Sequence, residues 1–409
     1  MKAETNGTIE KKPRLMPQLF LAFACIVILG TGTLMYSPII IPYTISLGGL
    51  ALHGTIIESV SKVLACLGVI YVGHLSTWQG RKRALIYIYL LGASGMIMSA
   101  LAPNTVWLLI SSTITSLSFA SMAAVMMTYL VEISPEGRQG MAMGVFGTGI
   151  GVSAVIGALM ATTMAEMFGF RVPFLFAAGA TLAGALFVSL FFVESVKASV
   201  QISTKHKGIH GLKLLPMLLK LNFLLLFLYI GAAGYQFLQS SLSTLLTPLV
   251  QSLGLPLNVA GIGIGAFGIF GLMQPLGGRL GDHFGRRQTI IIGAVMFVAG
   301  MFMLYSANSA VMIIIGTSFF GIGTSLYVPS ISTQVCLMAP VEARGAAMGL
   351  YQSVLTIGAV LGPVSGGLAL QYISPRAPFM LNGIVITIVF LLLVFTWQNV
   401  KASRDDCDC

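Results

Sequence analysis

The stretches GHLSTWQGRKR, residues 73–83, and GRLGDHFGRRQ, residues 278–288, resemble each other and lie 205 residues apart. At the same offset, the tetrapeptide RVPF that begins at Arg171 matches the tetrapeptide RAPF that begins at Arg376. Chance rarely keeps one offset between matches that are so widely spaced along a chain. The sequence is therefore interpreted as a duplication, in which the second half repeats the design of the first.

Apolar residues dominate the composition. Of the 409 residues, 56% are hydrophobic and 8% are charged, and the mean hydropathy is +0.93, whereas soluble domains carry about 25% charged residues. Twelve continuous apolar runs are each near the roughly 20 residues that a helix needs to cross a bilayer. They predict an all-α polytopic membrane protein with 12 transmembrane helices in two pseudo-symmetric six-helix bundles, because a β-barrel would alternate apolar and polar residues. The expected spans are 17–43, 54–76, 84–102, 106–132, 140–164, 172–193, 217–245, 257–277, 289–306, 310–337, 345–371 and 377–397.

These spans divide the chain into five expected segments. The first span is too long for the apolar core of a signal peptide and shows no cleavage pattern, so we expect it to remain in the protein. Frequent Gly and Pro residues need close helical neighbours in lipid, which favours compact bundles, and a monomer in the bilayer is expected. The segments are an N-terminal tail 1–16, a bundle 17–193, a linker 194–216, a bundle 217–397 and a C-terminal tail 398–409.

The positive charges are distributed unevenly. The formal net charge is +10, and 19 of the 22 Lys and Arg residues lie in the tails, the linker and alternate short loops. Arg171 and Arg376 lie in the other set of loops, and Lys62 lies inside a span. Cytoplasmic loops carry such an excess of positive charge. The pattern predicts an integral protein of the cell (inner) membrane with both termini in the cytoplasm, and it argues against a nucleic-acid partner.

Signals for an enzyme, a metal site or a cofactor site are weak. The five cysteines lie in spans or in the terminal sequence DDCDC, which is interpreted as a solvated tail rather than a soft-metal site. The stretch GIGIGAFGIFG, which begins at Gly261, has the glycine spacing of a nucleotide-binding loop. It lies inside an apolar span, however, and therefore indicates close helix packing. No enzymatic activity, no metal and no cofactor are expected.

The repeated stretch also carries a family resemblance. GRLGDHFGRR, residues 278–287, resembles the signature loop between helices two and three of the major facilitator superfamily. The first copy keeps the pattern except that Thr77 replaces the usual Asp. With the helix count, the termini and the central linker, the resemblance covers the whole chain, and its general pattern is similar to the multidrug and metabolite efflux branch. It implies a transporter fold that works by alternating access.

The resemblance further implies a cytoplasmic gate. In the family this loop latches the two halves together, with its Asp near the positive end of a helix in the opposite half. Thr77 carries no charge, so the first-half latch is expected to be weaker. Glu132 stands where the family often places an acid that pairs with the loop arginine, here Arg81. These charges could instead be merely interfacial and solvated. The gate candidates are Gly73, Thr77, Gly80, Arg81, Glu132, Gly278, Asp282, Gly285 and Arg286.

A carboxylate and an ammonium interrupt the second apolar span. At about 1.5 Å per residue, Lys62 lies roughly 16 Å and Glu58 roughly 22 Å from Gly73 along the helix. The two are one turn apart and could form an ion pair. Intramembrane charges are functional candidates by default, so Glu58 is a candidate proton carrier, and Lys62 could tune it or bind an anionic substrate. Alternatively, Glu58 snorkels to the outer surface, and hydroxyls or carbonyls of helix four satisfy Lys62.

In the family, helices 1, 4, 7 and 10 line the central pathway. Here those spans carry hydroxyl and amide side chains among Phe and Met residues, which suits a moderately polar or amphipathic small molecule as substrate. Many of these side chains could instead bond their own backbone or a neighbouring helix. The candidate lining residues are Tyr36, Ser112, Thr115, Tyr235, Gln236, Gln239, Tyr327 and Gln334.

Two departures from the family pattern bear on coupling. Proton-driven antiporters of the family often carry Arg in helix four near Ser112 and a Gly-Pro pair in helix five. Here helix four has no Arg, the helix-five pair is Gly157-Ala158, and Gly362-Pro363 occurs in helix eleven. The expected function is secondary transport of a small organic solute, with proton-coupled export favoured. The alternatives are a symporter or facilitator for a small organic anion that pairs with Lys62, and a membrane sensor on the same fold.

Overall fold

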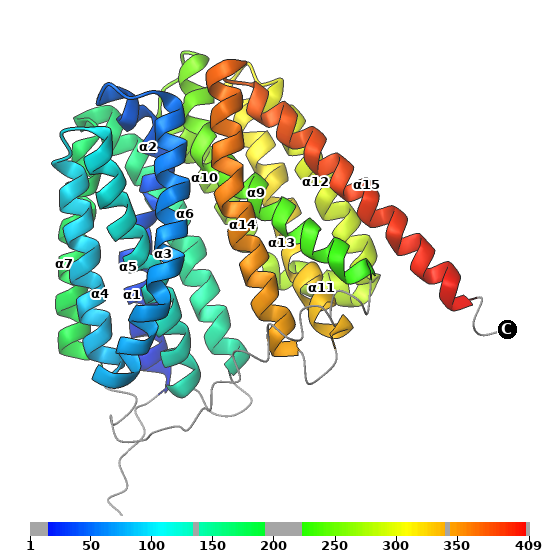
Figure 1. Cartoon of the computed structure of the whole chain (residues 1–409), viewed down its shortest axis with the longest axis horizontal. Coiled ribbons are helices and arrows are strands. Elements are labelled where there is room, and N and C mark those ends of the chain that lie inside the picture. The colour runs from blue at the N-terminus through cyan, green and yellow to red at the C-terminus, as the bar shows by residue number, and fades with distance from the viewer. Residues whose placement is uncertain (1–14, 134–138, 193–222, 340–343, 406–409) are drawn as a thin grey trace, which may run out of the picture.

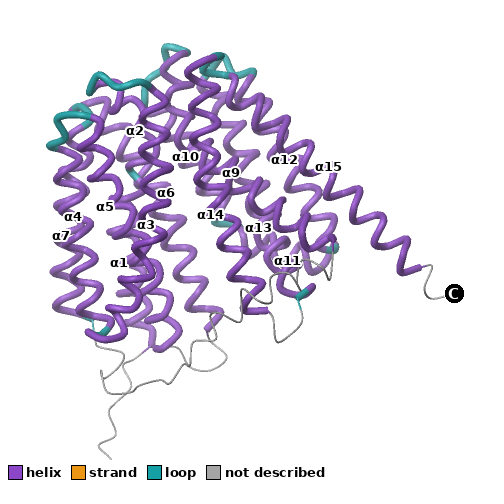
Figure 2. The backbone as a smooth tube through the Cα atoms, in the orientation of Figure 1, coloured by secondary structure: helices purple, strands orange, loops and turns teal. Residues whose placement is uncertain are grey.

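The computed structural model describes residues 15–133, 139–192, 223–339 and 344–405, and in these ranges every regular element is a helix (Figure 1, Figure 2). The N-terminal half contains α1 Leu15–Leu34, α2 Tyr36–Ser46, α3 Ala51–Gln79, α4 Arg81–Ala100, α5 Thr105–Ile133, α6 Gln139–Phe168 and α7 Arg171–Phe191. The C-terminal half contains α9 Phe223–Ser252, α10 Asn258–Gly271, α11 Gln274–Phe284, α12 Arg286–Tyr305, α13 Ala310–Met338, α14 Arg344–Tyr372 and α15 Ala377–Asp405.

The expected apolar spans fall on these helices. Ten described helices are long and apolar enough to cross a membrane, or eleven if the bent pair of α10 and α11 forms one span. The remaining expected span falls on α9, a helix of 30 residues that carries Gln236, Gln239 and several hydroxyl side chains. The predicted all-α membrane fold is confirmed. The linker 194–216, residues 1–14 of the N-terminal tail and residues 406–409 of the C-terminal tail lie outside the described residues.

Two of the expected spans consist of two helices each, and one of these pairs is sharply bent. The first divides at Met35 into α1 and α2. The span expected over 257–277 divides into α10 and α11, whose axes differ by 46°. Pro275 in the first turn of α11 explains this bend, because proline has no N–H to donate and its ring collides with the carbonyl of the preceding turn. The last helix is also longer than expected, since α15 continues past 397 to Asp405.

The signature stretches are helical over most of their length, so the loop between the two helices is short in both halves. The helices α3 and α11 continue to Gln79 and Phe284, and the turns are confined to Gly80 and Gly285. These two glycines have φ angles of +91° and +94°, a region that residues with a Cβ avoid. Each signature stretch is therefore a helix end followed by a one-residue turn.

The two halves of the chain lie side by side and touch through three helix pairs, α3 with α14, α6 with α10 and α2 with α9 (Figure 1). Glycines allow the close approach: a Cβ on Gly367 would lie 2.1 Å from Thr55 Oγ1. In addition, Glu166 of α6 accepts a hydrogen bond from the backbone N–H of Asn258, the first residue of α10, at 3.0 Å. A carboxylate at this helix end is favourable because it faces the positive end of the helix dipole.

The bundle has two distinct faces. The basic face carries the turns at Gly80 and Gly285 with the arginines that follow them. The opposite face carries the connections 47–50, 101–104, 169–170 and 253–257. The halves meet toward the opposite face and spread apart toward the basic face (Figure 1). The two halves are thus in contact mainly toward the opposite face.

Gly277 marks a very close approach between α11 and α13. A Cβ on Gly277 would lie 1.8 Å from the carbonyl oxygen of Ser325, whereas a Cβ on Gly278 would lie 3.7 Å from Pro329. We expect Gly277→Ala to lower the free energy of unfolding by about 1–3 kcal/mol and the matched Gly278→Ala to leave it near the parent value. Thermal unfolding in detergent measures both. Equal melting temperatures for the two variants would contradict the close packing.

Candidate functional site

A cavity of about 540 Å³ lies between the two halves. Its wall is formed by α1, α2, α3, α5 and α6 on one side and by α9, α10 and α14 on the other. The volume falls within the range of small-molecule sites, about 300–1,000 Å³. The polar lining consists of hydroxyl and amide side chains: Thr33, Tyr36, Ser37, Ser112, Ser116, Gln236, Gln239, Ser240, Ser243, Gln352 and Thr356. The apolar lining includes Phe119, Ile264, Phe267 and Leu355.

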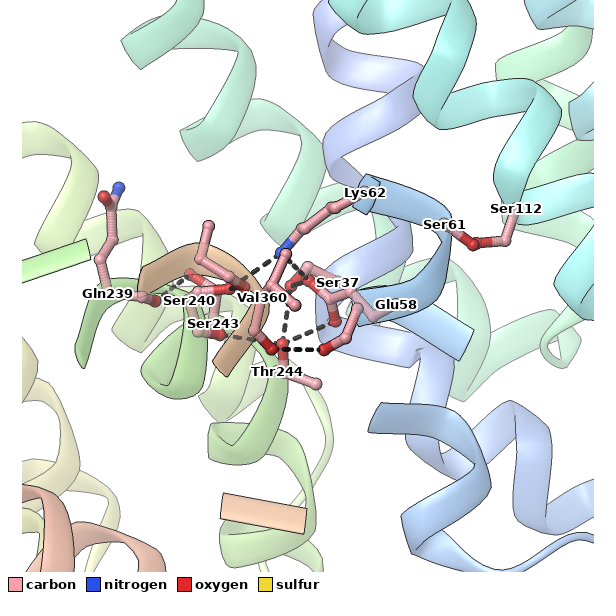
Figure 3. A network of polar contacts seen from close by, with 12 residues as sticks. Ser37, Glu58, Ser61, Lys62, Ser112, Gln239, Ser240, Ser243, Thr244 and Val360 are labelled. Atoms are coloured by element: carbon pink, nitrogen blue, oxygen red, sulfur yellow. Dashed lines mark hydrogen bonds and ion pairs between the residues drawn. The ribbon is translucent and has the colours of Figure 1, made fainter. Parts of the chain in front are cut away.

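Glu58 and Lys62 are the only charged residues among the described residues that line this cavity. They are one turn apart on α3, and Lys62 Nζ lies 2.7 Å from Glu58 Oε1 (Figure 3). The apolar Val63, Leu64 and Leu67 on α3 are exposed but do not line the cavity. A charged residue at the centre of a bilayer costs about 2.5–3.5 kcal/mol on insertion scales. Pairing the two charges over a polar cavity reduces that cost.

The Glu58 carboxylate is held by both halves of the protein. Its Oε1 accepts from Ser37 Oγ of α2 at 3.0 Å as well as from Lys62. Its Oε2 accepts from Thr244 Oγ1 of α9 at 2.6 Å. The side chain is only 11% exposed, and a buried carboxylate needs such donors to replace water. Three donors therefore surround Glu58, and one of them comes from the opposite half.

The Lys62 ammonium is more open than its partner. Nζ donates to Glu58 and to Ser240 Oγ of α9 at 2.8 Å, which uses two of the three N–H groups of an ammonium. Ser240 Oγ in turn lies 2.8 Å from the carbonyl oxygen of Ala359 on α14. The Lys62 side chain is 31% exposed and lines the cavity. A ligand in the cavity can thus reach the ammonium more easily than the carboxylate.

Small hydroxyl residues join α3 to its neighbours on both sides of the ion pair. Ser61 Oγ lies 2.6 Å from Ser112 Oγ of α5, and Ser59 Oγ donates to the carbonyl oxygen of Val360 of α14 at 2.8 Å. The first bond lies within the N-terminal half, and the second crosses to the C-terminal half. The α3 helix is therefore anchored to both halves around Glu58 and Lys62.

The structure brings half of the predicted lining residues into the cavity. Tyr36, Ser112, Gln236 and Gln239 line it. The other four, Thr115, Tyr235, Tyr327 and Gln334, are not among the described lining residues. Thr115 donates to the backbone of its own helix at Ser111. Tyr235 and Tyr327 pack instead against Phe297, with ring centroids 5.5 Å and 5.3 Å away, so their rings belong to the core of the C-terminal half.

Ser240 and Thr244 hold the ion pair but are not among the residues predicted from the sequence. They are four residues apart on α9, the same spacing as Glu58 and Lys62 on α3, so each pair lies on one face of its helix. That matching spacing is a signal in the sequence. It is a weak one, because serine and threonine also join membrane helices in many places that carry no function.

The glycines of the signature stretches have different environments. Gly80 and Gly285 form the turns at the basic face, and Arg81 begins α4. A Cβ on Gly278, one of the gate candidates, would meet its nearest neighbour at ordinary contact distance, and the close approach of the helices is at Gly277. The packing of α11 against α13 therefore requires a residue without a side chain at Gly277 but not at Gly278.

The charged gate candidates are only partly described. Asp282 Oδ1 accepts from Arg286 Nη2 at 2.8 Å, and Asp282 is 67% exposed. This ion pair lies within one half and spans one helical turn. Gly73 and Thr77 lie in α3 and Glu132 lies in α5, but their side-chain surroundings fall outside the described part of the structure.

Metal-ligating side chains are not gathered anywhere in the described residues. No group of three or more His, Cys, Asp and Glu side chains there could hold a metal ion. The terminal sequence DDCDC lies almost entirely outside the described ranges, which end at residue 405. The polar groups of the cavity are hydroxyls, amides and one ion pair, a set that suits an organic solute rather than a bound metal.

Comparisons with known sequences identify the family of this chain. The family model described as Major Facilitator Superfamily matches residues 19–271 and 228–406. The Multi-drug resistance efflux pump PmrA of Streptococcus pneumoniae is 24% identical over 359 residues, which cover 87% of this chain and 88% of the pump. The PmrA homolog of Lactococcus lactis is 24% identical over 371 residues, which cover 88% of this chain and 87% of that protein.

Solved transporter structures share the fold. A bacterial homolog of the human lysosomal transporter Spinster, in an inward-facing and unoccupied conformation, matches with a TM-score of 0.77 at 13% identity, covering 95% of this chain and 98% of that one. The nucleoside transporter NupG matches with a TM-score of 0.74 at 16% identity, covering 94% and 100%. The family match extends over both halves, and the chain belongs to the major facilitator superfamily.

Proposed function

We propose that the protein is a secondary active transporter that exports a small amphipathic organic solute by alternating access and admits protons in exchange. One observation carries the proposal: the ion pair of Glu58 and Lys62 faces a cavity between the halves and is bonded to both. Membership of a transporter family supports transport, and the relatives named multi-drug resistance efflux pumps support export. We propose a monomer that acts as a carrier and not as an enzyme.

The distribution of charge supports a specific orientation in the membrane. The basic face carries Arg81, Arg286 and Arg287, whereas Arg171 and Arg376 lie at the opposite face. Cytoplasmic loops carry the excess of positive charge, so we propose that the basic face is cytoplasmic in the cell (inner) membrane and that both termini lie there. Since the halves meet at the opposite face, the conformation described here is then the inward-facing one.

The charge of the cavity determines how a solute and a proton affect each other. With Glu58 ionised, the described lining has no net charge. With Glu58 protonated, Lys62 gives it a charge of +1. A cationic solute then prefers the ionised form and expels the proton, which is antiport. An anionic solute prefers the protonated form and carries the proton with it, which is symport. This coupling is reciprocal by thermodynamic necessity.

The favoured substrate class is therefore a cationic or neutral amphipathic compound. Antiport of such a compound uses the inward proton gradient to drive export. Phe119, Ile264 and Phe267 supply the apolar surface for the body of the solute, and Gln236, Gln239 and Gln352 supply hydrogen-bonding groups. Such a mixture suits ligands that vary in shape more than it suits a sugar.

A second candidate function is symport of a small organic anion. The observation in its favour is that Lys62 is 31% exposed and Glu58 only 11%, so an anion can reach the ammonium without displacing the carboxylate. Uptake would then follow from the proton gradient. The sign of the substrate charge thus separates the two candidates, because it fixes whether proton and solute move in opposite directions or together.

The cytoplasmic gate fits the inward-facing assignment. In that conformation the signature loops should be disengaged, and Asp282 is exposed and paired with Arg286 of its own half. We propose that Asp282, Gly285 and Arg286, together with Gly73, Thr77, Gly80, Arg81, Glu132 and Gly278, form the latch when the basic face closes. The uncharged Thr77 should make the contribution of the first half smaller than that of the second.

Replacing Glu58 tests its role in proton exchange. In Glu58→Gln the amide has nearly the same shape but cannot take up a proton, so solute-driven proton flux should fall to the level of empty vesicles. Solute exchange across the membrane without a pH gradient should continue, which serves as the internal control. Proteoliposomes with a trapped pH-sensitive dye and a panel of organic cations, neutral compounds and anions provide the measurement. Parent-level coupling in this variant would remove Glu58 from the mechanism.

The pH dependence of binding tests the charge of the substrate. For a cation that expels one proton, affinity should increase with pH by at most roughly tenfold per pH unit, and binding should release protons into the buffer. Titration calorimetry in two buffers of different ionisation enthalpy counts these protons. Tighter binding at lower pH, with proton uptake, would favour the organic-anion symporter instead.

A further inference from the structure

Two hydrogen bonds form a ladder between α3 and α9 across the boundary of the two halves (Figure 3). The helices run in opposite directions, since α3 ends at the basic face and α9 ends at the opposite face. Glu58 therefore meets Thr244 on the rung nearer the opposite face, and Lys62 meets Ser240 one turn deeper. The rungs measure 2.6 Å and 2.8 Å. Both charges of the pair are thus tied to one helix of the other half.

The hydroxyl groups differ in how freely they can turn. A hydroxyl donates one hydrogen. Ser240 lies 2.8 Å from the Ala359 carbonyl, which accepts its hydrogen, so its oxygen remains to accept from Lys62. Thr244 Oγ1 has three possible acceptors, Glu58 Oε2 at 2.6 Å, the Ser240 carbonyl at 2.9 Å and Ser37 Oγ at 3.3 Å. An ionised Glu58 is the stronger acceptor, because charge-assisted hydrogen bonds are roughly twice as strong as neutral ones.

Protonation of Glu58 reverses the direction of the hydrogen bond between Glu58 and Thr244. The carboxyl O–H can donate to Thr244 Oγ1 while Thr244 turns its hydrogen to the Ser240 carbonyl of its own helix. The bond across the boundary is then neutral and weaker, and Lys62 has lost its counter-charge. Opening the opposite face separates α3 from α9 and breaks both rungs, whereas Ser37 and Lys62 stay with Glu58 in its own half. Protonation therefore lowers the cost of opening that face.

We propose that Ser240 and Thr244 are positioning residues that couple the protonation of Glu58 to the closure of the opposite face. Their bonds keep that face closed in the empty carrier while Glu58 is ionised. A proton on Glu58, or a cationic solute that binds the carboxylate in place of Thr244, releases it. The inference rests on the proposed exchange of protons at Glu58. It assigns the coupling between protonation and closure to two uncharged residues of α9. Among the described lining residues, the half that contains α9 contributes no charge to the cavity.

Cys66 provides a native reporter of the face to which the cavity opens. It is exposed and lines the cavity, whereas Cys25 is buried. With Cys336, Cys407 and Cys409 replaced by serine, a membrane-impermeant maleimide labels Cys66 from the side that has access to the cavity. Labelling of vesicles in both orientations gives the ratio of opposite-face to basic-face access.

Three substitutions on α9 test the proposal. We expect Thr244→Val to increase the ratio of opposite-face to basic-face labelling about tenfold, which corresponds to about 1.4 kcal/mol, and to lower the number of protons moved per solute. Thr247→Val is the matched control, since Thr247 Oγ1 is buried with no hydrogen-bond partner among the described residues. Thr247→Val and the hydroxyl-preserving Thr244→Ser should both behave like the parent. An equal shift in Thr244→Val and Thr247→Val would assign the effect to packing and overturn the proposal.

A double variant distinguishes this inference from the proposed function. In Glu58→Gln the charge-assisted bond is already absent, so the addition of Thr244→Val should change the labelling ratio little. If Thr244→Val matches its control while Glu58→Gln loses proton coupling, the role of Thr244 is wrong and that of Glu58 stands. If Glu58→Gln keeps full coupling, the proposed function fails and this inference fails with it.

Discussion

The buried ion pair is the constraint on which the arrangement of the halves depends. Two opposite charges within a membrane-spanning bundle require partners for every polar atom, and α3 alone supplies too few. The missing donors and acceptors come from α2 and, across the boundary, from α9. Distances of 2.6–2.8 Å across that boundary need helices that approach closely, which the contact of Gly367 with Thr55 permits. The small residues where the halves meet therefore allow the close approach that the charged pair in the cavity needs for its hydrogen bonds.

The duplication produced a symmetric scaffold with an asymmetric cavity. At the repeat offset of 205 residues, Glu58 corresponds to Gly263 and Lys62 corresponds to Phe267. Phe267 lines the same cavity, so one position of the repeat supplies an ammonium in the first half and an aromatic ring in the second. The cavity is amphipathic because the two copies diverged at these positions. A charged pair in both halves would have doubled the cost of burial and removed the apolar wall.

The sequence predicted the features that depend on local composition and missed those that depend on how distant helices cross. Bilayer thickness fixes the length of an apolar helix, so the spans were predicted closely, except where Met35 and Pro275 mark breaks. Glu58 and Lys62 were recognisable because charge is rare in such helices. Their partner Thr244 was not, since it lies 186 positions along the chain from Glu58. Tyr235 was predicted to line the cavity for its hydroxyl, but its ring packs in the core of its own half.

A carrier must keep its two conformations within a few kcal/mol of each other, or it would remain in one of them. The opposite face is held by the ladder of α3 and α9 and, nearer the surface, by Glu166 at the first turn of α10. At the basic face, the uncharged Thr77 is expected to weaken the first-half latch. In the proposed mechanism, both features favour the conformation that is open to the basic face when the carrier is empty and Glu58 is ionised. In the proposed mechanism, a proton on Glu58 weakens only the bonds between α3 and α9, so it shifts this balance without changing any contact at the basic face.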